Sequence, residues 1–212
     1  MRPPESWSGA RVTLGLAAAT AAAWVLASLF GLTDLAARYA SFVPADVGED
    51  IAGPRAPVWL TPLTATLVHG HIVHLAFNLL ILVFCGRPAE GVVGPGGLVI
   101  LYLVGAYAAA AGHYLVDPAD LAPMIGASGA ISAVLGAYAM LFGRNRVRVA
   151  NPRLALWLNA LWLMAAWIVL QLIVGHTFAG IGIGIAFAAH IGGFLAGVLL
   201  AYPLLLLRYR GA

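Results

Sequence analysis

Long apolar segments constrain this chain more than any other feature of its sequence. Six of them follow one another, at residues 11–32, 72–86, 96–115, 126–142, 154–174 and 181–207, and residues 64–71 extend the second upstream. A helix needs about 20 apolar residues to cross the hydrocarbon core of a bilayer. Only 9% of the residues are charged and 62% are hydrophobic, which is typical of polytopic membrane proteins. We therefore expect an all-α membrane protein with a six-transmembrane-helix bundle.

The residues outside these spans show no soluble domain, so we predict one membrane domain at residues 11–207. Residues 1–10 are polar and rich in proline, and residues 208–212 form a second short tail. The first apolar segment is longer than the core of a signal peptide, which has about 7–15 residues, so we expect it to be retained as a helix. The partly apolar segment after it is expected to lie in the membrane interface.

The arginines are distributed unequally between the two sides of the predicted bundle. The side that carries both termini holds nine of them: Arg2, Arg11, Arg87, Arg144, Arg146, Arg148, Arg153, Arg208 and Arg210. The opposite side holds only Arg38 and Arg55. Because positive residues favour the cytoplasmic side, both tails are predicted to be cytoplasmic. The expected location is a cell membrane, which the chain crosses several times.

Composition excludes several kinds of site. The chain has no lysine, so a Ser–Lys dyad cannot form. It has no HExxH zinc motif, and no acidic residue lies in the middle of an apolar span, which argues against an aspartyl protease. Cys85 is the only cysteine and cannot form an intramolecular disulfide. The arginines lie beside apolar segments rather than on one polar face, so no nucleic-acid partner is expected. A serine activated by a histidine remains.

The candidate nucleophile is Ser128, in the sequence Gly126-Ala127-Ser128-Gly129. It opens an apolar helical segment shortly after Pro123, a helix breaker. A serine at a helix N-terminus lies near unpaired backbone N–H groups and the positive end of the helix dipole. Such groups can stabilise an oxyanion. The serine still needs a base, which must come from elsewhere in the chain.

Few polar side chains lie inside the spans, and such residues are functional candidates because they are costly to place there. His190 lies in the middle of the sixth span beside glycines that permit a close neighbour, and Ser128 is the obvious partner. His74 and Asn78 are four residues apart, so they share one face of the second span.

The less specific interpretations concern the remaining histidines. A single histidine in an apolar segment is usually a hydrogen-bonded core residue, and we expect this of His113 and His176. The cluster of His69, His71 and His74 is an alternative metal site, but its spacing is irregular and no carboxylate or cysteine lies nearby. No metal and no cofactor are therefore expected. Asn78 alone would most often be an interhelical hydrogen-bonding group.

Taken together, these motifs resemble the rhomboid family of intramembrane serine proteases, over about residues 58–205. They are His74-x-x-x-Asn78, Gly126-x-Ser128-Gly129 and Ala189-His190-x-x-Gly193-x-x-x-Gly197, in order and on the second, fourth and sixth spans. The resemblance implies a Ser128–His190 dyad and an oxyanion hole of His74, Asn78, Gly126 and the Ser128 backbone. It implies as partners the lipid bilayer and membrane-protein substrates with a transmembrane segment. Glu90 and His69 match further residues that bacterial members carry, so the resemblance also implies a bacterial inner membrane as the location.

The chain departs from the family pattern in two places. The first loop has Trp59-Leu60-Thr61-Pro62, without the arginine that often follows the tryptophan. Ser132 stands four residues after the nucleophile, where many members have an aromatic residue stacked on the histidine. His190 is then held either less firmly or by another ring. Three interpretations are open for the aromatic residues along the fifth span, which include Trp157, Trp162 and Trp167. They face lipid, they fill the core, or they form a lateral gate.

Two other functions compete with hydrolysis. One is a rhomboid-like processing transpeptidase, which transfers the acyl end of a cleaved protein to another nucleophile through the same acyl-enzyme. The other is a non-catalytic rhomboid-fold protein that binds membrane clients. Such binders lack the serine or the histidine, and this chain has both. The sequence indicates neither the substrate nor the oligomeric state.

Overall fold

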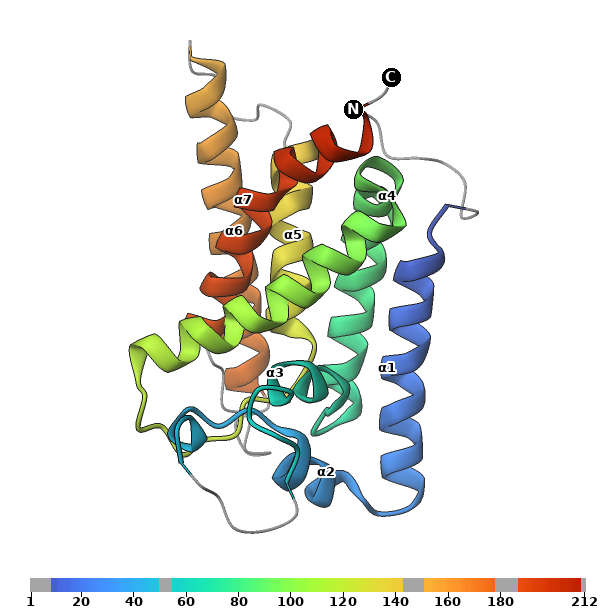
Figure 1. Ribbon diagram of the computed structural model, residues 1–212, viewed down its shortest axis with the longest axis vertical. Coiled ribbons are helices and arrows are strands. Elements are labelled where there is room, and N and C mark those ends of the chain that lie inside the picture. The colour runs from blue at the N-terminus through green and yellow to red at the C-terminus, as the bar shows by residue number, and fades with distance from the viewer. Residues whose placement is uncertain (1–8, 50–54, 143–150, 178–186, 211–212) are drawn as a thin grey trace.

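The structure is a computed structural model that describes residues 9–49, 55–142, 151–177 and 187–210 (Figure 1). Within those ranges the regular elements are all helical, and an isolated antiparallel bridge joins Phe42 to Met124. In chain order they are α1 (Arg11–Leu29), α2 (Thr33–Ala40), η1 (Pro44–Asp46), α3 (Thr61–Thr64), η2 (Ala65–Leu67), α4 (Ile72–Val116), α5 (Ser128–Phe142), α6 (Pro152–Thr177) and α7 (Phe187–Arg208), where η marks 3-10 helices. The prediction of an all-α fold is confirmed.

Three of these helices, α1, α4 and α7, are long and apolar enough to cross a membrane, and α5 and residues 154–170 of α6 are shorter apolar helices. Large apolar side chains such as Leu29, Phe84 and Leu199 point outward and are 65–75% exposed. Apolar surface of this extent is what lipid covers in a membrane protein. The first, fourth and fifth predicted spans correspond to α1, α5 and α6. The sixth corresponds to α7, apart from residues 181–186, which lie outside the described ranges.

The second and third predicted spans lie in one bent element, α4. We expected the second span to end at residue 86, and this was wrong, because the helix continues through Pro88 and bends at Gly94. Gly94 has φ +83°, outside the helical region, and Pro95 has no N–H to continue the ladder. Figure 1 shows the two limbs of α4 running in different directions from this bend. Arg208 of α7 donates to the Glu90 carbonyl at 3.1 Å, next to the bend.

Glu90 fastens the start of α1 to this bend. Its buried carboxylate accepts hydrogen bonds from the backbone N–H groups of Val12 at 2.9 Å and Thr13 at 2.8 Å, and from Thr13 Oγ1 at 2.7 Å. The first N–H groups of a helix have no partner within the helix, and negative charge is favoured at that end. The Glu90 carboxylate gives these N–H groups acceptors and also places negative charge at the start of α1.

We expect Glu90→Ala to lower the free energy of unfolding by about 1–3 kcal/mol, because it leaves buried donors of α1 without an acceptor. Glu90→Gln keeps the shape and one acceptor oxygen, so it should lose less. Thermal unfolding of both variants in the same detergent measures the difference. Equal melting temperatures for the wild type and Glu90→Ala would contradict this role.

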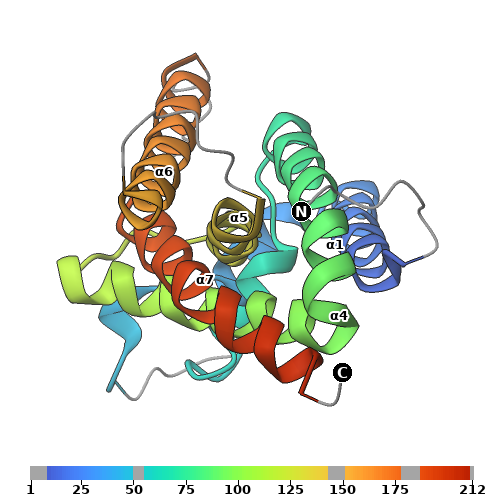
Figure 2. The ribbon, with the colours of Figure 1, turned by 90° about the horizontal axis from the view of Figure 1, so that it is seen from above.

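The core of the bundle is α5, which lies between α4 and α7 (Figure 2). Every α5 residue except Tyr138 and Phe142 is buried. Glycines bring the α7 backbone against α5: a Cβ added at Gly193 would lie 2.1 Å from the Gly129 carbonyl oxygen, and one at Gly197 would lie 1.8 Å from that of Ala133. Small residues thus let the two helices pack closely, as the glycines beside His190 indicated.

At the other end of the bundle, the loop between α4 and α5 is bonded to the segment that follows α2. The backbones of Phe42 and Met124 exchange two hydrogen bonds, of 3.1 and 2.8 Å, and the Ala45 N–H donates to the Asp120 carbonyl at 3.1 Å. The Gly126 N–H donates to the Ala65 carbonyl at 2.9 Å. These contacts hold the residues that lead into α5, so they fix the position of Ser128.

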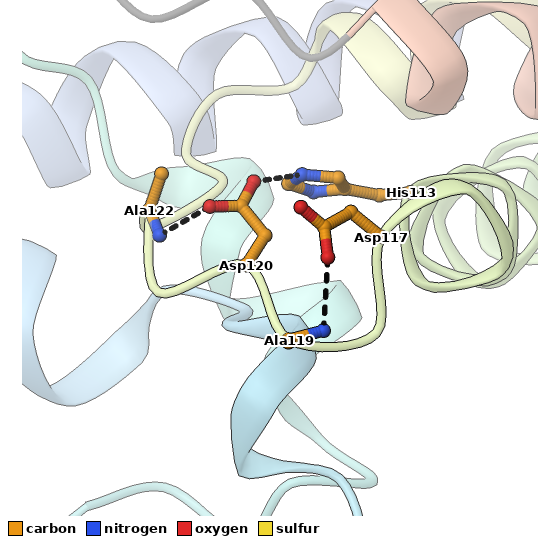
Figure 3. A network of polar contacts seen from close by, with 5 residues as sticks. All are labelled: His113, Asp117, Ala119, Asp120 and Ala122. Atoms are coloured by element: carbon orange, nitrogen blue, oxygen red, sulfur yellow. Dashed lines mark hydrogen bonds and ion pairs between the residues drawn. The ribbon is translucent and has the colours of Figure 1, made fainter.

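Asp120 is the centre of the polar network in that loop (Figure 3). Its carboxylate accepts the Ala122 N–H at 2.8 Å and contacts His113 Nε2 at 2.8 Å. These two contacts hold the pKa of Asp120 below its ordinary value, the Ala122 N–H contributing most. His113 is buried and hydrogen-bonded, so its prediction as a core residue is confirmed. The side chain of His176 lies outside the described part of the chain.

We expect Asp120→Asn to reduce stability only where Asp120 is ionised. Its depressed pKa means that the folded state favours the carboxylate, so this stabilisation is fully present above about pH 4 and is lost as the pH falls through the folded value. The side chain is 30% exposed, so the effect should be at most about 1 kcal/mol. Melting curves at neutral and acidic pH test it. A difference that persists unchanged in acid would contradict the interpretation.

Candidate active site

Ser128 is the first residue of α5, and a turn with unusual backbone geometry leads into it. Gly126 in that turn has φ +102°, which favours glycine. A Cβ added there would lie 2.5 Å from His74 Nε2 and 3.7 Å from Asn78 Nδ2. Gly126 therefore lets the turn lie directly against the polar face of α4. Ser128 itself is buried, at 8% exposure.

His190 contacts Ser128 from α7. Its Nε2 lies 2.8 Å from Ser128 Oγ, although the two residues are far apart in sequence. Gly193, about one turn after His190, contacts the backbone of Gly129, the residue that follows Ser128, and this contact allows the approach. A hydroxyl hydrogen-bonded to an imidazole is the arrangement that activates an alcohol as a nucleophile.

The other ring nitrogen of His190 has no hydrogen-bond partner among the described residues. In a serine protease triad, a carboxylate normally occupies that position and orients the imidazole. The histidine is 5% exposed, so packing against its neighbours helps to orient the ring.

His74 and Asn78 lie on one face of α4, as predicted, and that face points at the turn before Ser128. His71 Nδ1 accepts the His74 N–H at 3.1 Å and so caps the start of the helix. Asn78 Nδ2 donates to the His74 carbonyl at 3.0 Å. The Ala127 N–H, in the same turn, donates to His69 Nε2 at 3.5 Å.

The three histidines of the cluster are neighbours, with ring centroids 4.9 Å apart for His69 and His74 and 5.8 Å apart for His71 and His74. Nevertheless, in the described ranges no three His, Cys, Asp or Glu side chains form a group able to hold a metal ion. The polar groups that the structure gathers at Ser128 are thus imidazoles, an amide and backbone N–H groups. Uncharged donors of this kind suit a negatively charged oxygen.

One residue of the site was not identified from the sequence. Trp167 of α6 donates its indole N–H to Ser132 Oγ at 2.9 Å, and Ser132 Oγ in turn donates to the Ser128 carbonyl at 2.8 Å. The Trp167 ring also meets the His190 ring edge-on, with centroids 6.0 Å apart. Of the interpretations left open for Trp167, the structure favours the core, because only 5% of it is exposed.

A signal for this residue was present in the spacing of the tryptophans. Trp157, Trp162 and Trp167 are five residues apart, and each step turns a helix by about 140°. They cannot all face lipid. Trp157 and Trp162 are 47% and 62% exposed, and Trp167 is the one that turns inward.

Comparisons with known proteins found one family model and several relatives that match this chain. Residues 57–207 match the family model described as "Rhomboid domain". The Rhomboid protease GlpG of Pectobacterium atrosepticum is 27% identical over 191 residues, which are 90% of this chain and 62% of that protein. The Rhomboid protease GluP of Bacillus subtilis is 35% identical over 88 residues, which are 42% of this chain and 17% of that protein. RHOMBOID-like protein 4 of Arabidopsis thaliana is 30% identical over 151 residues, 70% of this chain and 35% of that protein. The chain spans less than two thirds of the length of each of these relatives.

Proposed function

Because this chain belongs to the rhomboid family, we propose that it is an intramembrane serine endopeptidase that cleaves transmembrane or membrane-proximal segments of membrane proteins. The observation that carries the proposal is the 2.8 Å contact between His190 Nε2 and Ser128 Oγ, inside a bundle of apolar helices. The curated relatives named as rhomboid proteases support the same class of reaction.

In this mechanism Ser128 Oγ attacks the carbonyl carbon of the scissile peptide bond while its proton passes to His190 Nε2. The tetrahedral intermediate collapses when His190 returns the proton to the leaving nitrogen and the C–N bond breaks. Ser128 then carries the acyl group as an ester. Water attacks this ester as it gives a proton to His190. His190 then returns that proton to Ser128 Oγ as the C–O bond breaks and the acid is released.

The negative oxygen of each tetrahedral intermediate needs donors, and we assign this role to His74, Asn78 and the Ser128 backbone N–H. The positions of His74 Nε2 and Asn78 Nδ2 beside the turn before Ser128 support the assignment. Gly126 completes the oxyanion site because its missing side chain leaves room beside the His74 ring. Donors that are already in place when charge develops stabilise the transition state without reorganisation.

The chain is a multi-pass membrane protein, and we propose six crossings with both termini in the cytoplasm. The two limbs of α4 supply two of the crossings, with the Gly94 bend on the cytoplasmic side. Residues 1–10 and 208–212 are then short cytoplasmic tails around a membrane domain at residues 11–207. Proteins with a transmembrane segment reach the site from the surrounding bilayer.

Incubation of purified protein with a labelled single-span membrane protein, followed by mass spectrometry of the products, tests the function. Hydrolysis gives two fragments, with a free carboxyl terminus on one of them. A fragment joined to an added amine nucleophile would indicate a transpeptidase instead. Binding without any new terminus, under conditions where a rhomboid protease cleaves the same substrate, would indicate a non-catalytic binder.

We expect cleavage to be insensitive to metal chelators. The proposed chemistry activates a serine with a histidine and assigns no step to a metal. The measurement is the initial rate after dialysis against a chelator, and again after zinc is added back. A rate that disappears and returns with zinc would assign the cluster of His69, His71 and His74 to a metal and contradict the serine mechanism.

A further inference from the structure

We propose that Trp167 of α6 is a positioning residue for His190, and that it does this work together with Ser132. The inference rests on the proposed function, because it concerns the base of the Ser128–His190 pair. It starts from the fact that no described residue bonds to His190 Nδ1. Rotation of an imidazole about its Cβ–Cγ bond is only weakly restricted by the side chain itself. The ring must therefore be held by a neighbour.

Trp167 is placed to be that neighbour. Its ring packs edge-on against His190, with an interplanar angle of 64° and centroids 6.0 Å apart. This geometry is favourable for aromatic pairs. Both side chains are 5% exposed, so neither ring has much space to turn. The indole forms a wall beside the imidazole and limits its rotation away from Ser128.

The indole is itself held in place by a hydrogen bond. Trp167 Nε1 donates to Ser132 Oγ, and Ser132 Oγ donates to the Ser128 carbonyl. Ser132 is fully buried, one turn after the nucleophile on the same helix. The four residues thus form a closed ring of contacts, from the Ser128 carbonyl through Ser132 and Trp167 to His190 and back to Ser128 Oγ. The helix that carries Ser128, α5, therefore also holds Trp167, the side chain that orients His190.

This arrangement makes the dyad depend on the position of α6. In Figures 1 and 2, α6 stands at one edge of the bundle, beside α5 and α7. A shift of α6 away from α5 would remove the wall beside His190 without moving either member of the dyad. A misplacement of about 1 Å is enough to slow a reaction by about 10²-fold.

The first test compares Trp167→Leu, which removes the ring, with Trp162→Leu, its exposed neighbour on the same helix. We expect Trp167→Leu to lower kcat by about 10–10²-fold at nearly unchanged KM, and Trp162→Leu to leave kcat within about 3-fold. Trp167→Phe keeps a ring against His190 and should recover most of the lost kcat. If Trp167→Leu lowers only the folded fraction, and the remaining protein turns over normally, Trp167 merely fills the core and the proposal is wrong.

The second test uses smaller changes at the same contacts. Ser132→Ala removes one oxygen and should lower kcat by about 3–10-fold, because the indole loses its anchor. Ser132→Ala and Trp167→Phe both remove the same hydrogen bond, so the double variant should lose little more than the single ones. The proposed connection would be overturned if the two losses of kcat multiplied in the double variant. It would also be overturned if Ser132→Ala lost no kcat.

Two readouts separate this inference from the proposed function. Labelling of Ser128 by a fluorophosphonate needs the dyad but no peptide substrate, and it should slow in Trp167→Leu as kcat does. Nitrogen NMR of ¹⁵N-histidine protein needs no activity, and the His190 signals should change in Trp167→Leu but not in Trp162→Leu. A wild type that labels but does not cleave contradicts the protease function alone. Unchanged His190 signals in Trp167→Leu contradict the positioning role alone.

Discussion

Ser128→Ala and His190→Ala are each expected to lower the rate of cleavage by about 10⁴-fold or more, while both proteins remain folded. Ser128→Ala removes the atom that forms the acyl-enzyme, and His190→Ala removes the base that activates it. Because the two residues act as a unit, the double variant should be about as slow as either single variant. The measurements are initial rates on a single-span substrate, and melting temperatures of the same preparations.

The matched control is His113→Ala, which replaces another buried histidine. His113 contacts Asp120 in the loop before α5 rather than Ser128, so its variant should lose stability but keep its turnover per folded molecule. Activity near the wild-type level in Ser128→Ala or His190→Ala would refute the assignment of the dyad. A folded but inactive His113→Ala variant would mean that the loop network takes part in catalysis.

Asn78→Ala should lower kcat by about 10–10³-fold with little change in KM, because a donor to the oxyanion acts mainly in the transition state. Asn78 is buried, and its Nδ2 lies beside the turn before Ser128 while it also donates to the His74 carbonyl. His74→Ala should show a loss of the same kind. Turnover and melting temperature must be measured on the same preparations.

A structural role would give a different pattern. If Asn78 only joins helices, its variant should melt early and the surviving folded protein should turn over normally. Asn78→Asp is a useful companion, because it keeps the size of the side chain but places a carboxylate where negative charge would develop. It should be at least as slow as Asn78→Ala, and a fast Asn78→Asp variant would exclude the oxyanion role.

Much of this site could be predicted because the chemistry leaves few choices. Without lysine, and with so few polar residues inside the spans, Ser128 and His190 were an obvious pair, and the structure brings them into hydrogen-bond distance. The glycines beside His190 indicated a close contact of α7 with α5 for a similar reason, because small residues let two helix backbones approach each other. The family resemblance built on these motifs is confirmed by the domain match.

The course of α4 and the role of Trp167 were harder to predict, because both depend on tertiary contacts. Local rules end a helix near Arg87-Pro88, but α4 continues to Gly94, where Arg208 from the far end of the chain supports the bend. Glu90 likewise bonds to Val12 and Thr13, which lie 78 and 77 positions earlier in the chain. The apolar character of Trp167 does not distinguish lipid from core, and only the packing of α6 against α5 decides which it meets.

The position of His190 on α7 has a consequence for the order in which the chain is made. Synthesis proceeds from the N-terminus, so α5 enters the membrane with its serine well before α7 is available. In the proposed mechanism, Ser128 has no base until α7 docks its glycines against Gly129 and Ala133, so a nascent chain carries an unactivated alcohol at this position. The proposed peptidase acts on neighbouring membrane proteins only after its own fold is complete.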